Sequence, residues 1–162
     1  MSKSNLFSIA LLWSCFLASC SSYDTFDEMA QAMCAGRVPD VAWSEVPTDA
    51  VIVDVRSEAE WKISHLKQAV NLEWSGTKLT NLPMLNKDTP ILVYCSVGYR
   101  SEQAGEYLLQ KGYTHVYNLY GGLFKVYNEN QVDLISHNNT AQIHGYNQRW
   151  GKWITRGGVC YE

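Results

Sequence analysis

Two short, strongly apolar runs constrain the fold of this chain more than any other feature. Residues 50–55 read AVIVDV and residues 90–94 read PILVY. Apolar runs of this kind, rich in β-branched residues, are typical of strands that are buried on both faces of a sheet. A strand of this kind needs a layer of structure on each side, so we expect a chain built in layers around a central sheet.

Helix signals alternate with these runs. The capping-box pattern at residues 25–28 and again at 57–60 indicates two helix starts, and Gly112 ends a segment with one apolar face. The expected helices cover residues 25–34, 57–61 and 101–111, with an irregular helical stretch at 77–85. The expected strands cover residues 50–55, 69–72, 90–94 and 115–119. This alternation predicts an α/β fold, with a doubly wound, mainly parallel sheet of about five strands and helices on both faces.

Cys95 directly follows the second apolar run, at the edge where a parallel sheet binds ligands. It opens a short loop, CSVGYR, that leads into the next helix. The free N–H groups and the positive dipole end of that helix, together with the charge of Arg100, favour a thiolate at this position. Gly98 allows the loop to curl so that successive N–H groups face the sulfur. These features indicate a reactive cysteine rather than a buried structural one.

Three motifs resemble those of the rhodanese-like domain family, in the family's order and spacing, over about residues 38–127. They are DVR at 54–56 with EW at 60–61, HL at 65–66 and AVNL at 69–72; YCSVGYRS at 94–101; and VYNLYGGL at 116–123. Two positions depart from the family pattern. Ser64 stands where Gly usually precedes His, and Val126 where Trp is common after Gly-Gly. Both lie outside the Cys95 loop, so we expect them to change packing rather than chemistry.

The resemblance implies a sulfurtransferase that works through a persulfide on Cys95. The thiolate would take the outer sulfur of a small sulfur-containing donor and pass it to a thiol or to cyanide. The residues expected to bind the donor are Ser96, Val97, Gly98, Tyr99, Arg100 and Ser101. The residues expected to support the site structurally are Asp54, Arg56 and His65. Arg56 would form an ion pair with Glu60 at a helix start. Because Arg100 is the one charged residue of this loop, we expect it to hold dianionic thiosulfate less well than a loop with several Lys or Arg.

Two other functions fit part of the pattern. Phosphatases and arsenate reductases also place a cysteine and an arginine around an oxyanion. The resemblance, however, associates the six-residue loop from Cys95 to Arg100 with sulfur transfer, and a loop one residue longer with related phosphatases. The second alternative is a non-catalytic lipoprotein module that binds polysulfide or a protein partner, and a measured rate of persulfide turnover would distinguish it from an enzyme.

The composition excludes one class of partner. The 162 residues carry 13 Lys and Arg against 16 Asp and Glu, a net charge of −3. The sequence has no long run of like charges that could bind the phosphate backbone of a nucleic acid. Nucleic acid is therefore not an expected partner. With 46% hydrophobic residues, the chain can fill a packed core. The histidines show no metal-ligand spacing, so we expect neither a metal nor another cofactor; they are His65, His115, His137 and His144.

The N-terminus has the features of a bacterial lipoprotein signal. Lys3 precedes an apolar stretch at residues 6–17, which is too short to span a bilayer. The LASC that ends at Cys20 resembles a lipobox, which implies removal of residues 1–19 and a lipid on Cys20. The expected location is therefore extracytoplasmic and lipid-anchored to a bacterial membrane. In a Gram-negative organism, Ser21 after the cysteine resembles the outer-membrane sorting signal. A secreted protein with a free Cys20 and a true N-terminal anchor are the alternatives.

The chain is thus expected to have four parts. They are the signal at 1–19, the lipidated cysteine, tether and first helix at 20–37, a rhodanese-like domain at 38–130, and a C-terminal extension at 131–162. In the extension, apolar residues recur at near-helical spacing, with basic residues between them: Ile143, Tyr146, Trp150, Trp153 and Ile154. We expect an aromatic helix there, packed on the sheet in preference to lying on the membrane.

Two cysteines of the mature chain remain once Cys20 is assigned to lipid and Cys95 to chemistry. In an oxidising compartment, Cys34 and Cys160 are a possible disulfide that would join the two ends of the mature chain. The alternatives are two separate thiols, or a resolving cysteine that attacks the Cys95 persulfide.

Overall fold

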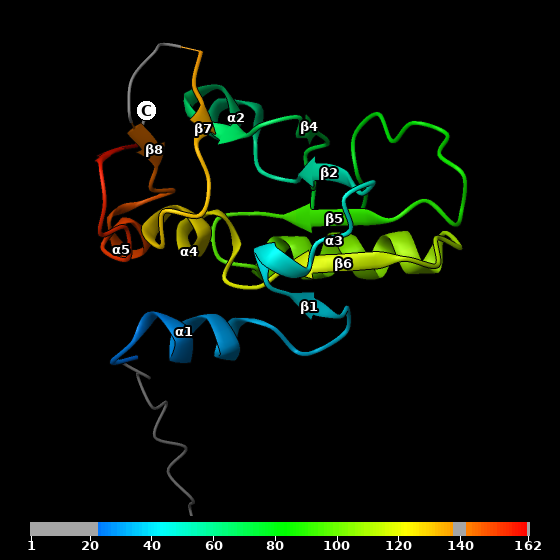
Figure 1. The fold of residues 1–162 in the computed structure, drawn as a ribbon, viewed down its shortest axis with the longest axis horizontal. Helices are drawn as coiled ribbons and strands as arrows, with labels where there is room; N and C mark the ends of the chain where they lie inside the picture. The colour runs from blue at the N-terminus through cyan, green and yellow to red at the C-terminus, as the bar shows by residue number, and fades with distance from the viewer. Residues whose placement is uncertain (1–22, 138–141, 162) are drawn as a thin grey trace, which may run out of the picture.

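A five-stranded parallel sheet forms the centre of the computed structural model, which describes residues 23–137 and 142–161 (Figure 1). Its strands lie in the order β1-β6-β5-β2-β4, and every pairing is parallel. Their bounds are β1 Asp40–Val41, β2 Val51–Asp54, β4 Val70–Asn71, β5 Ile91–Tyr94 and β6 Val116–Leu119. The predicted α/β fold with a parallel sheet of five strands is confirmed.

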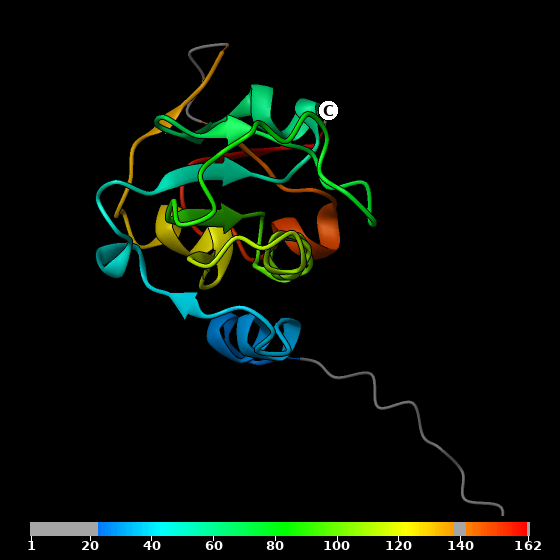
Figure 2. The same ribbon diagram turned by 90° about the vertical axis from the view of Figure 1, so that its right-hand side faces the viewer.

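Helices cover both faces of this sheet. Within β5, Leu92 and Tyr94 point into one core cluster, and Ile91 and Val93 into the other. The first cluster includes residues of α1 and α4, and the second includes residues of α3. Both views place α1 beyond β1, at one edge of the sheet (Figures 1 and 2). The helices are α1 Phe26–Met33, α2 Glu58–Ile63, α3 Tyr99–Gln110 and α4 Gly122–Asn128, with a 3₁₀ turn at Trp43–Glu45.

Both predicted capping boxes begin helices. The side chain of Thr25 accepts a hydrogen bond from the backbone N–H of Glu28 at 3.2 Å, and Ser57 Oγ accepts one from that of Glu60 at 3.3 Å. In each case the glutamate side chain reaches back to the N–H of the capping residue.

The irregular helical stretch expected at residues 77–85 is wrong. Leu79 instead pairs with Trp74 in an isolated antiparallel bridge and is buried against the core. Ser75 and Lys78 close the turn between them. Pro83 has no N–H to donate to a helix, so no helix forms to compete with this tertiary contact.

The C-terminal extension is not the aromatic helix expected from its apolar spacing. It contains β8 (Gln142–His144), the single-turn α5 (Gln148–Gly151) and β9 (Gly158–Cys160). Strands β8 and β9 pair in parallel, and the preceding β7 (Leu134–Ile135) pairs antiparallel with β3 (His65–Leu66). The backbone hydrogen bonds of β8 go to β9 and not to a helix. Trp150, Trp153 and Ile154 nevertheless pack against the first core cluster, the one that contains Leu92 and Tyr94 of β5.

The signal segment and Cys20 lie outside the described residues. Within residues 23–137 and 142–161, no helix combines the length and the apolar character needed to cross a bilayer.

We predict that Gly105→Ala destabilises the protein although alanine favours a helix. A Cβ at position 105 would lie 2.9 Å from Cγ2 of the buried, stiff Val38. Overpacking of this kind costs about 1–3 kcal/mol, whereas the gain in helix propensity is at most about 1 kcal/mol. Urea unfolding should show a lower free energy of unfolding, with the exposed Gln110→Ala near wild type as the control. A Gly105→Ala protein as stable as wild type would contradict this packing.

Candidate active site

Cys95 lies at the carboxyl end of β5, where the chain leaves the sheet and turns into α3. Its side chain is almost fully buried, with 1% exposure. The backbone N–H of Gly98 donates a hydrogen bond to Cys95 Sγ at 3.2 Å. This donor lies at the N-terminus of α3, whose dipole favours a negative charge on the sulfur. The predicted nucleophile is therefore positioned as the strand-to-helix pattern indicated.

The shape of the loop depends on Gly98 and on side chains beneath it. Gly98 has φ of 103°, a conformation that residues with a Cβ rarely adopt. Its carbonyl accepts hydrogen bonds from Ser101 Oγ at 3.0 Å and from Asn118 Nδ2 at 3.3 Å. With this carbonyl held on one side, the Gly98 N–H faces Cys95.

The beginning of α4 holds the other half of the loop. The backbone N–H groups of Leu123 and Phe124 donate to the carbonyls of Cys95 and Ser96, at 2.9 and 3.0 Å. Gly122 permits this approach, because a Cβ there would lie 2.6 Å from the Cys95 carbonyl oxygen. The Gly-Gly sequence at the start of α4 thus serves to support the cysteine loop.

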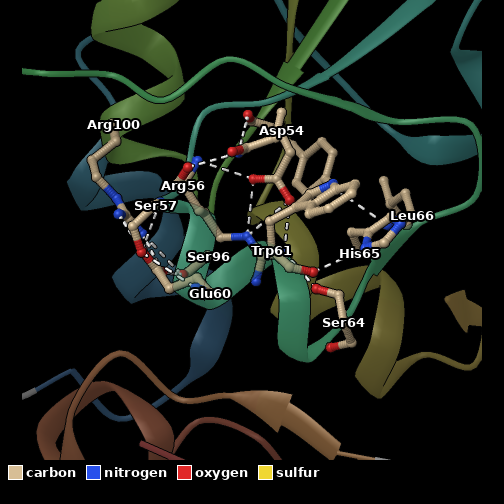
Figure 3. Close-up of polar contacts among 12 residues, drawn as sticks. Asp54, Arg56, Ser57, Glu60, Trp61, Ser64, His65, Leu66, Ser96 and Arg100 are labelled. Atoms are coloured by element: carbon tan, nitrogen blue, oxygen red, sulfur yellow. Dashed lines mark hydrogen bonds and ion pairs between the residues drawn. The ribbon is translucent and has the colours of Figure 1, made fainter. Parts of the chain in front are cut away.

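Arg100 forms a bidentate ion pair with Glu60 of α2 (Figure 3). Its two terminal nitrogens donate to the carboxylate at 2.8 and 2.7 Å, and one also donates to Ser96 Oγ at 3.2 Å. Burial opposes the ionisation of Glu60, but the hydrogen bonds and charge of Arg100, helped by Arg56 and the Ser57 N–H, lower its pKa to about 2. The carboxylate is therefore ionised at neutral pH and compensates the charge of Arg100.

Glu60 pairs with Arg100, which corrects the expectation that Arg56 would pair with Glu60. Arg56 instead pairs with Asp54, with the closest contact at 2.6 Å, and both side chains are fully buried (Figure 3). Arg56 also donates to the Ser64 carbonyl at 2.6 Å. A fully buried guanidinium needs a charged partner, and Asp54 provides it at the end of β2, two residues before Arg56.

His65, the third predicted supporting residue, lies under α2. Its ring stacks on Trp61 at a centroid distance of 4.1 Å, and its Nδ1 lies 2.9 Å from the Trp61 carbonyl oxygen. Burial lowers the pKa of His65. Its place is in packing, away from the Cys95 cavity. Within the part of the chain that the structure describes, no three His, Cys, Asp or Glu side chains gather where they could hold a metal ion.

A cavity of about 270 Å³ opens beside Cys95. Of the predicted donor-binding residues, four line it, whereas Gly98 and Ser101 hold the loop from behind. The lining residues are Cys95, Ser96, Val97, Tyr99, Arg100, Tyr146 and Trp150. Sequence reasoning missed Tyr146 and Trp150 as site residues. Their aromatic spacing was the one signal they carried, and it indicated packing.

Cys34 lies against the active-site loop. Its sulfur accepts a hydrogen bond from Asn118 Nδ2 at 3.5 Å, and a Cβ built on Gly98 would lie 3.1 Å from it. Cys34 and Cys160 do not form the possible disulfide. Cys160 lies in β9, where it is the strand partner of His144 in β8.

The Cys34 thiol is not activated. Burial and the negative charges of Asp40 and Glu102, with a further contribution from Cys95, raise its pKa to about 12. A thiol that stays protonated is a poor nucleophile, which weighs against a resolving role for Cys34.

We predict that the Glu60–Arg100 pair stabilises the fold at neutral pH and is lost in acid. Because the pKa of Glu60 falls from 4.5 to about 2 on folding, its contribution is present above pH 4.5 and disappears as the pH falls toward 2. The shift corresponds to at most about 3 kcal/mol. The stability difference between wild type and Glu60→Gln should therefore narrow from pH 7 to pH 3 in urea unfolding. Glu58→Gln, which alters an exposed pair on the same helix, is the control. A difference independent of pH would contradict the prediction.

The relatives that this chain matches in sequence are longer proteins, and the match covers only part of each. The tRNA uridine(34) hydroxylase of Photorhabdus laumondii is 35% identical over 83 residues, and that of Sodalis glossinidius is 29% identical over 112 residues. These alignments cover 48% and 65% of this chain, but 23% and 32% of the two relatives. The chain therefore matches a quarter to a third of each of these proteins.

Two solved structures share the fold. The polysulfide-sulfur transferase homodimer from Wolinella succinogenes has a TM-score of 0.51 at 19% identity, covering 70% of this chain and 89% of that chain. A rhodanese-related protein from Thermoplasma volcanium has a TM-score of 0.52 at 22% identity, covering 60% and 97%. At these identities the likeness shows the fold alone. The profile of the rhodanese-like domain family matches residues 38–129, more than half of the sequence. The chain therefore belongs to the rhodanese-like domain family.

Proposed function

We propose that this protein is a sulfurtransferase that carries a sulfane sulfur as a persulfide on Cys95. The observation that supports this most directly is the position of the Cys95 sulfur. It borders a small cavity, accepts a hydrogen bond from the Gly98 N–H, and lies at the N-terminus of α3. Such a site favours an anionic sulfur in the persulfide that would form on Cys95.

The proposed reaction has two steps. The Cys95 thiolate attacks the outer sulfur of a donor, a new S–S bond forms, and the donor's own S–S bond breaks as its remainder leaves with the electron pair. An acceptor thiolate or cyanide then attacks the terminal sulfur of the persulfide and regenerates the Cys95 thiolate. The Gly98 N–H and the dipole of α3 would stabilise the anionic sulfur at each stage.

The same geometry disfavours the phosphatase alternative. A phosphatase needs its arginine free to clamp a tetrahedral dianion, whereas both terminal nitrogens of Arg100 are engaged by Glu60. The residues that line the cavity include no aspartate or histidine that could protonate a leaving group. The similarity to the tRNA hydroxylases supports a shared domain and not a shared activity, because the matched segment is a minor part of those proteins.

We predict that Cys95→Ser abolishes sulfur transfer and leaves the fold intact, because a hydroxyl cannot form a persulfide. Wild type incubated with a sulfane donor should gain the mass of one sulfur atom on the Cys95 peptide and form thiocyanate when cyanide is added. Cys34→Ser, a matched change at the neighbouring thiol, should retain both. Thiocyanate formation by Cys95→Ser would refute the mechanism. Failure of the wild type to load sulfur from any donor would favour the non-catalytic binding module.

We also propose that the protein is lipid-anchored through Cys20 on the outer side of a bacterial inner membrane or the periplasmic side of an outer membrane. The support is the lipobox-like sequence that follows the apolar segment. Four residues, 21–24, separate Cys20 from the Thr25 cap of α1. At about 3.5 Å per residue, they would keep the domain within roughly 14 Å of the lipid.

We predict that the full-length protein expressed in a Gram-negative host partitions into the detergent phase, and that Cys20→Ala moves it to the aqueous phase. Cys34→Ala should partition as the wild type does. Recovery of the unmodified wild-type chain from the soluble periplasm would contradict the anchor.

A further inference from the structure

Two aromatic residues from outside the family match complete the wall of the Cys95 cavity. Tyr146 and Trp150 belong to the C-terminal extension, whereas the family match ends at residue 129. In Figure 1, the arrow of β5 points toward the side of the molecule on which α5 lies. The Tyr146 ring lies 5.0 Å from the Arg100 guanidinium carbon, measured to the ring centroid. The extension therefore faces the same loop that carries the nucleophile.

The wall is held in place by contacts to the domain. The Asn128 side chain donates to the Trp153 carbonyl at 2.7 Å and accepts from the Thr155 N–H at 2.9 Å. Trp150 packs on the main core. The backbone of Tyr146 is in the left-handed region, with φ of 63°, and its N–H donates to His144 Nδ1 at 3.0 Å. Although Tyr146 is 51% exposed, this hydrogen bond holds its backbone in place.

The charge balance of the cavity disfavours a doubly charged donor. Arg100 is the one cationic side chain among the lining residues, and Glu60 compensates it through two hydrogen bonds. A dianion such as thiosulfate would meet no unpaired cation there, and it would have to give up water for a surface of Val97, Tyr99, Tyr146 and Trp150. A donor with one charge at most and an apolar body would gain by burying that body against the rings.

We propose that the C-terminal extension makes this cavity selective for an organic hydropersulfide, R–S–SH, in which R is apolar, over thiosulfate. This inference rests on the proposed persulfide function of Cys95. The thiolate attacks the outer sulfur of R–S–SH, so that Cys95–S–SH forms and R–S⁻ leaves with the electron pair of the broken S–S bond. One S–S bond is made and one is broken, the negative charge passes from Cys95 to the leaving thiolate, and no oxidant is consumed. Tyr146 and Trp150 act as specificity-determining residues that contact R.

The test compares two donors, benzyl hydropersulfide and thiosulfate, on the full-length protein. The rate at which Cys95 gains one sulfur is measured by mass spectrometry, and each rate is divided by that of the same donor with free cysteine. For the wild type, we expect this normalised rate to be higher with benzyl hydropersulfide than with thiosulfate. Tyr146→Asn, which removes the ring but tolerates the left-handed backbone, should lower the benzyl hydropersulfide rate about tenfold and should not lower the thiosulfate rate.

Two further variants make the result specific. Tyr146→Phe keeps the ring and should keep the preference. Tyr120→Asn removes a tyrosine that also lies near a cation, Lys125 at 5.4 Å, but does not line the cavity, so it should behave as wild type. Wild type that loads sulfur without preferring the apolar donor would overturn this inference and leave the proposed function standing. Wild type that loads no sulfur from either donor would overturn both.

Discussion

The burial of β5 on both faces is the constraint on which the rest of the structure depends. All four of its residues are buried, so the strand can occupy only the middle of the sheet, between β2 and β6. A central parallel strand must leave the sheet at its carboxyl end, and Cys95 is the first residue to do so. The chain turns there because α4 donates two backbone hydrogen bonds to the carbonyls of Cys95 and Ser96. The N–H of Gly98 then donates to the cysteine sulfur.

Two ion pairs next to this loop have different roles because they differ in burial and in access to the cavity. Asp54 and Arg56 are fully buried and connect the end of β2 to the Ser64 carbonyl, so they stabilise the connection between strand and helix. Arg100 is partly exposed and borders the cavity, and its pairing with Glu60 compensates the positive charge on that side of the cavity. An arginine next to a nucleophilic cysteine therefore does not by itself make an anion site, since a buried carboxylate can compensate it.

The site combines two parts of the chain with different origins in the sequence. The family motifs provide Cys95 and the Gly98 N–H that donates to its sulfur, and the extension after residue 129 provides an aromatic wall. Members of one fold family can thus keep a common reaction and differ in the body of the substrate, because the reacting atoms contact the loop and the remainder contacts whatever packs over it. In this protein the aromatic wall of Tyr146 and Trp150 is apolar, and the charge of the adjacent Arg100 is compensated by Glu60.

The sequence by itself determined the features that depend on local patterns. The apolar runs predicted β2 and β5, the capping boxes predicted the starts of α1 and α2, and the strand–cysteine–glycine–helix order predicted the place of Cys95. Only the tertiary structure decided which side chains meet across the chain. The spacing of Arg56 and Glu60 suggested a pair within one helix start, but in the folded chain Arg56 pairs with Asp54, and Glu60 pairs with Arg100, 40 residues away. Likewise, near-helical spacing indicated a helix in the extension, whereas pairing of β8 with β9 broke that pattern and turned Tyr146 toward the active site. Local propensity is a weak preference, and the free energy of burying side chains and of pairing distant strands and charges outweighs it.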